Sequence, residues 1–306
     1  MAKVLIATEK PFAPVAVKGI RKIVEEAGFE LNLLEKYTEK SQLLTAIADV
    51  DAVIIRSDKI DAEVLDAAKN LKIVVRAGAG YDNVDCEAAK AHNVCVMNTP
   101  GQNSNAVAEL CMGLIIYGLR NFYNGASGRE LAGKKVGILA YGYIGKLVAK
   151  YCKAFGCEVY AYHPRRTDEQ IKADGVIPTH SQEELFEKCD IVSVHTPSRP
   201  ENKGCVNYAC MSKIREKGII LNTARKEVFN EEDLIKVMNE RTDIKYITDI
   251  QPACHEKMVA EFEGRYYATP KKMGAQTAEA NINAGLAAAN QIVKFIKNGD
   301  ETFRVN

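Results

Sequence analysis

The stretch Val136–Gly145, VGILAYGYIG, decides the fold of this chain. It reads as a buried strand that runs into a helix through the pattern A-x-G-x-x-G, with Ala140 in place of the usual first glycine. Gly142 would let the backbone approach a pyrophosphate, and Gly145 would let helix and strand pack closely, with free amides at the helix start facing the anion. We therefore predict a dinucleotide site here, although a tight glycine turn without a ligand shows the same pattern.

Short apolar, β-branched runs recur on both sides of this stretch, and helical patterns separate them. Such runs are typical of strands buried in a parallel sheet with helices on both faces. We expect strands at residues 4–8, 51–56, 72–76, 94–98, 136–140, 158–162, 190–194, 218–221 and 245–248. We expect helices at residues 15–27, 62–69, 104–120 and 278–297. The sequence predicts an α/β fold with two doubly wound parallel-sheet units.

Length and pattern both indicate two domains. The 306 residues exceed the roughly 100 to 200 residues of a typical domain, and the alternation restarts after a seam near residues 98–104. The last predicted helix has an apolar face, and we expect it to cross back to the first domain. We predict one domain from residues 1–98 and 276–306, and a dinucleotide-binding domain from residues 99–275.

Composition excludes several classes of partner. The 41 Lys and Arg residues balance 40 Asp and Glu residues, so we expect no nucleic-acid partner and no anionic membrane partner. The first residues lack a secretory signal and no apolar run has the length of a membrane span, so we expect a cytosolic protein. The nine cysteines include no C-x-x-C pair, and we expect reduced, mostly buried thiols and no metal site.

The strand expected at residues 158–162 ends without a carboxylate. NAD enzymes normally hold an acid at this position on the ribose hydroxyls, but here His163, Pro164, Arg165 and Arg166 follow the strand. Arg165 and Arg166 are able to bind a 2′-phosphate, so NADP stays open beside NAD. The alternative is a solvent-exposed basic loop.

Three stretches carry a family resemblance: VVRAGAGYDNVD at residues 74–85, NTPGQNSNAVAEL at 98–110 and LNTAR at 221–225. They closely resemble D-isomer-specific 2-hydroxyacid dehydrogenases, among them 3-phosphoglycerate dehydrogenases, and the resemblance covers nearly the whole chain. It implies a Rossmann-type cofactor domain inserted in a flavodoxin-like substrate-binding domain. It further implies NAD as cofactor and a homodimer formed through the cofactor domain.

The resemblance also implies roles for particular residues. Arg225 matches the arginine that binds substrate and polarises its carbonyl group, the loop around Ala77, Gly78 and Ala79 matches backbone that holds the substrate carboxylate, and Asn103 matches a cleft asparagine. The positions that match cofactor-lining segments are Tyr143, Ile144, His195, Thr196, Pro197, Thr223, Ala224, Asp249 and Gly274.

The chain departs from the family pattern at two chemically important positions. Cys254 stands where the family has a glutamate five residues after Asp249, and the histidine motif T-P-H-I-G appears as Thr269-Pro270-Lys271-Lys272-Met273-Gly274. Lys272 takes the catalytic position if Gly274 sets the register, and Lys271 remains the register alternative. The chain, which also lacks tryptophan, resembles a subgroup of short 3-phosphoglycerate dehydrogenases with this lysine.

The two departures are chemically consistent with each other. A glutamate raises the pKa of a neighbouring histidine toward neutrality, whereas lysine starts at about 10.4 and needs lowering to act as a base. We predict that Lys272 takes the substrate hydroxyl proton while Arg225, at a strand end, binds the carboxylate and the forming carbonyl group. The alternatives are an unpaired surface lysine and a surface arginine in an ion pair.

Cations also follow the first-domain strands. They are Lys10, Arg56 with the adjacent Ser57, Lys59 and Arg76. Such a cluster is able to hold a phosphate, which favours 3-phosphoglycerate and a place in phosphorylated serine biosynthesis, although chance clustering is the alternative. We expect no inhibition by serine, since no residues after the last helix would build a regulatory domain.

Two rival functions stay open. One is hydroxypyruvate or glyoxylate reduction by the same chemistry. The other is a non-catalytic, dinucleotide-sensing partner protein on the same fold, as in the related C-terminal-binding corepressors. Retention of Arg225 favours an enzyme over the second rival.

Overall fold

A computed structural model describes all residues from Met1 to Asn306. The chain divides into two compact units, which are unit 1 (Met1–Asn103 with Gln276–Asn306) and unit 2 (Ser104–Ala275). Residues 99–103, which the sequence analysis assigned to the second domain, therefore lie in unit 1. Hydrogen bonds explain this placement, because Thr99 N donates to Gly78 O at 2.9 Å. No helix combines the length and the apolar character that spanning a bilayer requires.

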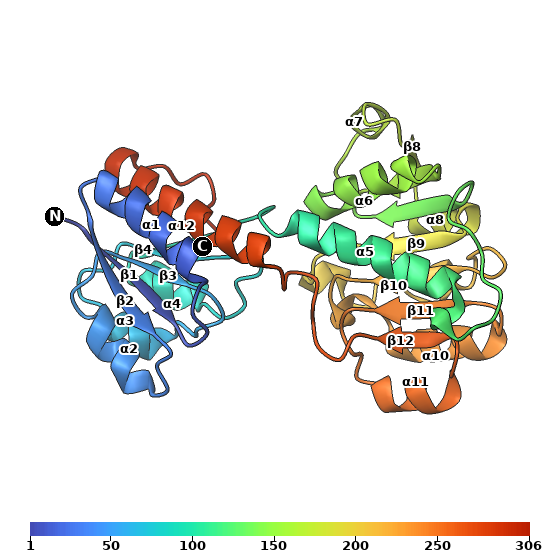
Figure 1. Ribbon diagram of the computed structural model, residues 1–306, viewed down its shortest axis with the longest axis horizontal. Helices are drawn as coiled ribbons and strands as arrows, with labels where there is room; N and C mark the ends of the chain where they lie inside the picture. The colour runs from blue at the N-terminus through green and yellow to red at the C-terminus, as the bar shows by residue number, and fades with distance from the viewer. The chain divides into compact units, whose positions relative to one another are not determined.

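Unit 1 is built on one five-stranded parallel sheet (Figure 1). Its strands are β1 Lys3–Thr8, β2 Glu30–Glu35, β3 Ala52–Ile55, β4 Ile73–Arg76 and β5 Cys95–Asn98. They are arranged in the order β2-β1-β3-β4-β5, which is the flavodoxin-like order of a doubly wound sheet. All carboxyl ends therefore meet at one edge, where ligands of such sheets bind.

Helices cover both faces of the unit 1 sheet. These are α1 Pro14–Glu26, α2 Lys40–Ile47, α3 Ala62–Ala67, α4 Cys86–Ala91 and α12 Ala278–Asn298. The helices α1 and α12 share one apolar core with one sheet face, and α2, α3 and α4 share a second core with the other. The helix α12 packs closely on α1, since a Cβ on Gly285 would lie 3.0 Å from Ile20 Cδ1.

Unit 2 contains a seven-stranded parallel sheet. Its strands are β6 Lys135–Leu139, β7 Glu158–Tyr162, β8 Ile177–Pro178, β9 Ile191–Val194, β10 Ile219–Asn222, β11 Lys245–Thr248 and β12 Tyr266–Ala268. Their order is β12-β11-β10-β9-β6-β7-β8, which is the Rossmann order extended by one strand. The two parallel sheets with alternating helices confirm the predicted fold class.

Two helical layers also sandwich the sheet of unit 2. The helices are α5 Ser104–Leu119, α6 Tyr143–Ala154, α7 Asp168–Lys172, α8 Gln182–Lys188, α9 Tyr208–Met211, α10 Glu231–Glu240 and α11 His255–Glu261. Residues of α5, α6 and α7 form the core on one face, and residues of α8, α9, α10 and α11 form the core on the other. The order switches direction between β9 and β6, which places the glycine turn after β6 at the crevice where such sheets bind dinucleotides.

Candidate active site

The glycine turn between β6 and α6 has the geometry expected of a pyrophosphate site. Gly142 is the N-cap of α6 and no side chain caps the helix there, while a Cβ on Gly142 would meet no atom within 4 Å. A Cβ on Gly145 would lie 2.8 Å from Ile138 Cγ2, so helix and strand pack too closely for a side chain. Ala140 takes a φ of 74°, a conformation that glycine adopts at less cost.

In the loop after β7, one arginine side chain binds the protein and another is exposed. His163 Nδ1 accepts from Arg165 N at 3.1 Å, and Arg166 Nε donates to Tyr141 O at 2.7 Å. Burial, together with Arg166 and Arg165, lowers the pKa of His163, so its ring is neutral near pH 7. Arg166 thus supports the glycine turn, whereas Arg165 is exposed at the strand end.

A buried polar group lies at the end of β9. His195 Nε2 lies 3.0 Å from Ser193 Oγ, and His195 Nδ1 is buried without a hydrogen-bond partner. Burial lowers the pKa of His195 to about 3. His195 is therefore neutral near pH 7. Thr196, next along the chain, is buried and Pro197 is exposed.

The turn after β10 presents Arg225. Asn222, fully buried at the end of the strand, accepts from Ala224 N at 3.0 Å and donates through Nδ2 to Arg225 O at 3.2 Å. Thr223 Oγ1 lies 3.3 Å from Cys111 Sγ on α5, which fixes the same turn from the other side. Sequence patterns give no sign of these roles of Asn222 and Cys111, although Asn222 belongs to the LNTAR stretch.

Asp249 and the loop that carries the lysines lie together. The Asp249 carboxylate is fully buried and accepts from Met273 N at 2.8 Å and from Gly274 N at 2.7 Å. It also accepts from Thr269 Oγ1 at 2.9 Å. Lys271 and Lys272, between these anchor points, are both exposed. A Cβ on Gly274 would stand 3.0 Å from Asp249 Oδ2, which explains why glycine suits this position.

A carboxylate does lie beside Cys254, the position of the family glutamate. Glu231, the first residue of α10, accepts from Cys254 N at 2.8 Å and from Ala253 N at 2.9 Å. Burial and Glu231 together raise the pKa of Cys254 to about 12, so its thiol stays protonated. Backbone donors hold this carboxylate in place, and sequence spacing gives no sign of it because Glu231 is remote along the chain.

In unit 1, the loop after β4 offers backbone donors. The amides of Gly78, Ala79 and Gly80 donate to no backbone carbonyl, whereas Ala77 N is bonded to Ile55 O at 2.8 Å. Asn98 Nδ2 donates to Ala79 O at 2.6 Å and so supports the loop from the end of β5. Backbone amides without an acceptor in the protein are able to bind an anion such as a carboxylate.

The strand-end cations of unit 1 lie close together. Arg76 Nε donates to Arg56 O at 3.0 Å, and Arg56 Nη1 donates to Lys10 O at 3.0 Å. The Arg56 guanidinium also binds Pro11 O at 3.2 Å and Asn281 Oδ1 at 2.6 Å. Much of its donor capacity is therefore used within the protein.

Other members of the predicted substrate site are accessible. Lys10 and Ser57 are exposed, while the Lys59 ammonium pairs with Asp61 at 3.6 Å. Asn103 is half-buried in the turn before α5. The predicted residues thus form one group in each unit. The substrate-binding candidates lie in unit 1. The cofactor-binding candidates lie in unit 2, and so do the catalytic candidates Arg225 and Lys272.

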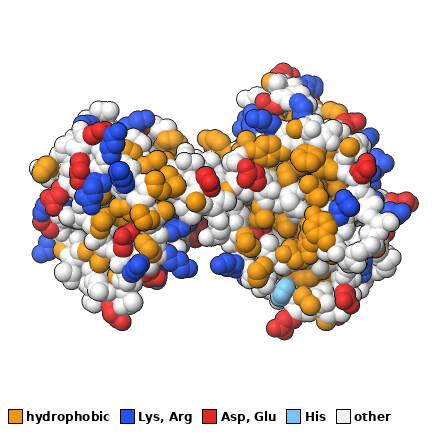
Figure 2. All heavy atoms as spheres, viewed as in Figure 1, with side chains coloured by type: hydrophobic (Ala, Val, Ile, Leu, Met, Phe, Trp, Pro, Cys, Tyr) orange, Lys and Arg blue, Asp and Glu red, His pale blue; other side chains and the backbone are white.

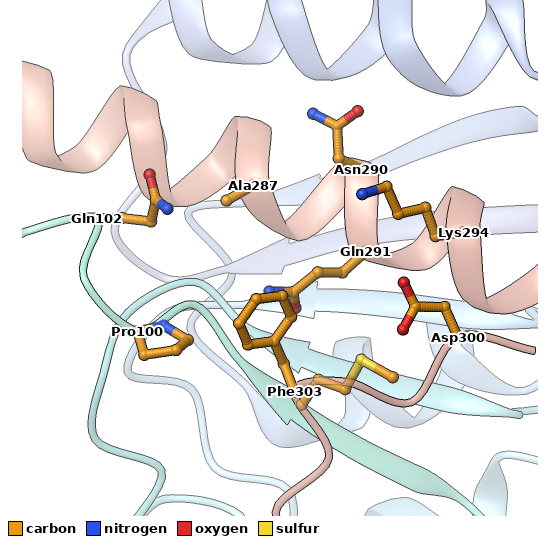
Figure 3. A pocket seen from close by; sticks show the side chains of 9 residues that line it. Pro100, Gln102, Ala287, Asn290, Gln291, Lys294, Asp300 and Phe303 are labelled. Carbon is orange, nitrogen blue, oxygen red and sulfur yellow. The ribbon is translucent and has the colours of Figure 1, made fainter.

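A cavity in unit 1 lies away from all these residues. It has a volume of about 180 Å³ and is lined by Met97, Pro100, Gln102, Ala287, Asn290, Gln291, Lys294, Asp300 and Phe303 (Figure 3). None of the predicted site residues lines it. Its walls come from α12, the end of β5 and the carboxyl-terminal segment.

The residues of unit 2 fit a dinucleotide. Gly142 leaves open space where a pyrophosphate would approach the uncapped start of α6. The unpartnered Nδ1 of His195 offers a hydrogen-bonding group at the end of a neighbouring strand.

Comparisons with known proteins agree with this geometry. Residues 6–306 match the model of the D-isomer specific 2-hydroxyacid dehydrogenase, catalytic domain. A hydroxypyruvate reductase of Thermotoga maritima is 32% identical over 285 residues, covering 87% of this chain and 91% of the relative. A D-3-phosphoglycerate dehydrogenase of Methanocaldococcus jannaschii is 31% identical, covering 90% of this chain and 55% of the relative.

One solved structure is more similar still. It is a 3-phosphoglycerate dehydrogenase of Entamoeba histolytica with bound NAD⁺, 48% identical, with a TM-score of 0.88 and coverage of 100% of this chain and 98% of that one. The chain belongs to the D-isomer-specific 2-hydroxyacid dehydrogenase family. It spans about half the length of the curated D-3-phosphoglycerate dehydrogenases that it matches.

Proposed function

We propose that the chain is an NAD-dependent dehydrogenase that interconverts 3-phospho-D-glycerate and 3-phosphohydroxypyruvate. The observation that carries this proposal is the similarity to the NAD⁺-bound 3-phosphoglycerate dehydrogenase of Entamoeba histolytica over the full length of both chains. A role in phosphorylated serine biosynthesis and a cytosolic location are parts of the same proposal.

The chemistry divides among three groups of the protein. A nicotinamide cofactor held by the glycine turn after β6 would supply the hydride acceptor or donor for carbon 2 of the substrate. Arg225 binds the substrate and stabilises the negative charge that develops on the carbonyl oxygen during reduction. The free amides of Gly78, Ala79 and Gly80 hold the carboxylate. Lys272 delivers the proton to the oxygen during reduction and takes it during oxidation.

The preference for a phosphorylated substrate rests on the cations of unit 1. Lys10 and Ser57 are exposed beside the Arg56 loop, and they provide a charged and a neutral donor for phosphate oxygens. Arg76 lies on the same edge, since it donates to Arg56 O. An unphosphorylated acid would bring no phosphate oxygens to these donors.

Hydroxypyruvate reduction is the second candidate. The Thermotoga maritima relative with that name is matched over 91% of its length, more than the D-3-phosphoglycerate dehydrogenases matched over about half of theirs. Both reactions use the same residues and differ in the terminal phosphate.

A substrate panel tests the proposal. Initial rates of NADH and NADPH oxidation are measured with phosphohydroxypyruvate, hydroxypyruvate, glyoxylate and pyruvate. We expect the highest kcat/KM with phosphohydroxypyruvate and NADH, with measurable use of NADPH because Arg165 is free to meet a 2′-phosphate. Equal or better kcat/KM with hydroxypyruvate would show the phosphate assignment to be wrong.

We also propose a homodimer formed through unit 2. Apolar side chains gather on the face of unit 2 that α5 forms (Figure 2). Leu110, Gly113 and Tyr117 follow one another at helical spacing there and are exposed or only partly buried. A helix that is apolar on its outward face as well as toward its core is typical of an interface.

A further inference from the structure

The cavity of unit 1 shown in Figure 3 contains a buried oxygen atom that no donor of the protein reaches. Gln291, on α12, is 8% exposed and lines the cavity. Its Nε2 donates to Asn98 O at 3.0 Å, whereas its Oε1 is buried without a hydrogen-bond partner. Turning the amide over would place Oε1 against the carbonyl oxygen of Asn98, so this contact fixes the orientation. A buried acceptor without a partner costs free energy, and a ligand with a hydroxyl donor would satisfy it.

Three further residues of α12 line the same cavity, namely Ala287, Asn290 and Lys294. Together with Gln291 they are spaced three and four residues apart, which places them along one side of the helix. The Lys294 side chain is exposed and has no ion pair or hydrogen bond within the chain. The rim of the cavity therefore offers an ammonium group that is available to a ligand.

The carboxyl-terminal segment forms another wall of the cavity, and hydrogen bonds hold it along β5. Val305 N donates to Val96 O at 2.9 Å, and Asn306 Nδ2 donates to Val94 O at 2.8 Å. These contacts fix the segment that brings Phe303 to the cavity. The Phe303 side chain is 38% exposed, so its ring has apolar surface that a ligand would cover.

The size and the polarity of the cavity define the ligand. An apolar cavity of roughly 150 Å³ accepts benzene, so the volume of about 180 Å³ suits one aromatic ring. Met97 and Phe303 supply apolar surface for this ring, while Gln291 supplies an acceptor for a hydroxyl group on it. Lys294 and Asp300 also line the cavity and form no ion pair with each other. A ligand with both a carboxylate and an ammonium group would complement these two charges.

We propose that this cavity is a binding site for a hydroxyaryl amino acid, a small zwitterion for which tyrosine is a suitable probe. Its hydroxyl group donates to Gln291 Oε1, and its ring packs against Met97 and Phe303. Its carboxylate binds Lys294 and its ammonium group binds Asp300. None of the predicted active-site residues lines the cavity, so the inference goes beyond the proposed function and does not depend on it.

Four probes that differ in one group each test the assignment. Binding of tyrosine, phenylalanine, tyramine and hydroxyphenylpropionate to the full chain is measured by saturation-transfer NMR titration. Phenylalanine lacks the hydroxyl group, tyramine the carboxylate and hydroxyphenylpropionate the ammonium group. We expect tyrosine to bind most tightly and phenylalanine to bind roughly 3- to 10-fold more weakly. Tyramine and hydroxyphenylpropionate should each bind roughly 2- to 5-fold more weakly than tyrosine, because the two charges lie at the solvent-exposed rim.

Variants assign each polar contact. Lys294→Met should weaken tyrosine binding and leave tyramine binding unchanged. Lys297→Met is its control and should change neither, since it removes the same charge from an exposed lysine of α12 that does not line the cavity. Asp300→Asn should remove the difference between tyrosine and hydroxyphenylpropionate. Gln291→Leu should weaken tyrosine to the level of phenylalanine, and retained phenylalanine binding shows that this variant is folded.

A variant that fills the cavity tests the location of the site. Ala287→Leu places a larger side chain in the cavity, so binding of all four probes should be lost. Thermal unfolding of the same sample shows that the chain remains folded.

Three results would overturn the proposal. Phenylalanine that binds as tightly as tyrosine would show that no ligand hydroxyl group meets Gln291. Unchanged tyrosine binding in Ala287→Leu would place the ligand elsewhere in the chain. Absence of tyrosine binding at its solubility limit would leave water as the partner of the buried oxygen. The titrations need neither cofactor nor turnover, so their outcome is independent of the substrate panel.

Discussion

Gly145 lies so close to Ala140 that a Cβ on the glycine would stand 2.7 Å from the alanine carbonyl oxygen. Side-chain carbons do not approach a carbonyl oxygen at this distance without displacing it. The close approach ties the first turn of α6 to the end of β6, and it sets the position of the helix amides that would face a pyrophosphate.

Gly145→Ala should therefore reduce both stability and cofactor binding. The added methyl group must push α6 away from Ala140 and Ile138, and such overpacking costs about 1–3 kcal/mol of unfolding free energy. Urea denaturation measures the first effect and NADH fluorescence titration the second.

Gly142→Ala is the matched control for this variant. A Cβ on Gly142 meets no atom and its φ of −95° suits any residue, so the loss of stability should be about 1 kcal/mol or less. Cofactor affinity should still fall, because the methyl group occupies the approach of the pyrophosphate. Equal destabilisation by the two variants would contradict the packing explanation.

Lys10→Ala and Arg56→Ala should show which of the two cations binds the substrate phosphate and which stabilises the fold of unit 1. Lys10 is exposed, so its loss should raise KM for phosphohydroxypyruvate by roughly 10-fold or more and affect hydroxypyruvate little. Arg56 holds Pro11 O and Asn281, so its loss should lower the unfolding free energy by about 1–3 kcal/mol. Substrate kinetics and urea denaturation on both variants check these effects. If Lys10→Ala raised the KM of both substrates equally, the result would count against a phosphate-binding role of Lys10.

Gly113→Asp should shift a homodimer toward monomers. Gly113 is exposed on the α5 face and has no atom near a potential Cβ, so the substitution is tolerated within one chain. A carboxylate buried at a dimer interface without a partner is costly. Sedimentation velocity over a concentration series measures the change. Val15→Asp, which puts the same charge on an exposed apolar position of unit 1, should leave the dimer intact.

Acid should destabilise the wild-type chain partly through His195. Burial lowers the pKa of His195 to about 3 from its ordinary 6.5, so the folded chain stays neutral there while the unfolded chain takes up a proton below pH 6.5. The stability present above pH 6.5 is then lost progressively as the pH falls toward 3, by up to about 1.4 kcal/mol per pH unit. His195→Gln should lose less stability than wild type between pH 7 and pH 5 in urea titrations. Parallel losses in the two proteins would show that His195 is not buried as a neutral ring.

Local sequence patterns were sufficient to predict most of the fold. The apolar runs that end in Arg76 and Asn98 are strands, and their polar ends lie at one edge as parallel pairing requires. The strand Glu30–Glu35 was not predicted, because ELNLLE lies at a sheet edge, where Leu31 is its one buried residue, and so lacks a continuous apolar signal. The short strand Tyr266–Ala268 was also not predicted. It lies at an edge of the unit 2 sheet, and only Tyr266 is buried.

The finer geometry of the site was beyond such patterns. The bond from Met273 N to Asp249 joins residues 24 positions apart and depends on how an irregular loop folds back. The direction of the Arg56 guanidinium depends on the carbonyl groups of Lys10 and Pro11 in another loop. Composition and spacing identify which residues gather at a strand end, but they do not say whether a side chain faces a ligand or the protein.

Lys272→Ala should lower kcat by roughly 10² to 10⁴, the usual range for loss of a general acid or base, and leave the cofactor Kd within about 3-fold. Lys272→Arg should not restore the rate, since a guanidinium group does not release a proton near neutral pH. Steady-state kinetics with the best 2-oxo acid and NADH titration without substrate measure the two effects.

Lys271→Ala is the control for the register, because both lysines are exposed in the same loop and only one is expected to serve the reaction. The Lys271 side chain can be removed without touching its carbonyl oxygen, which accepts from Thr269 Oγ1. The effect on kcat should therefore be much milder than that of Lys272→Ala. A reversed order of the two effects would move the proton transfer to Lys271. Near-normal kcat in both variants would exclude a lysine relay, and the proton would then have to travel through water or another group such as His195.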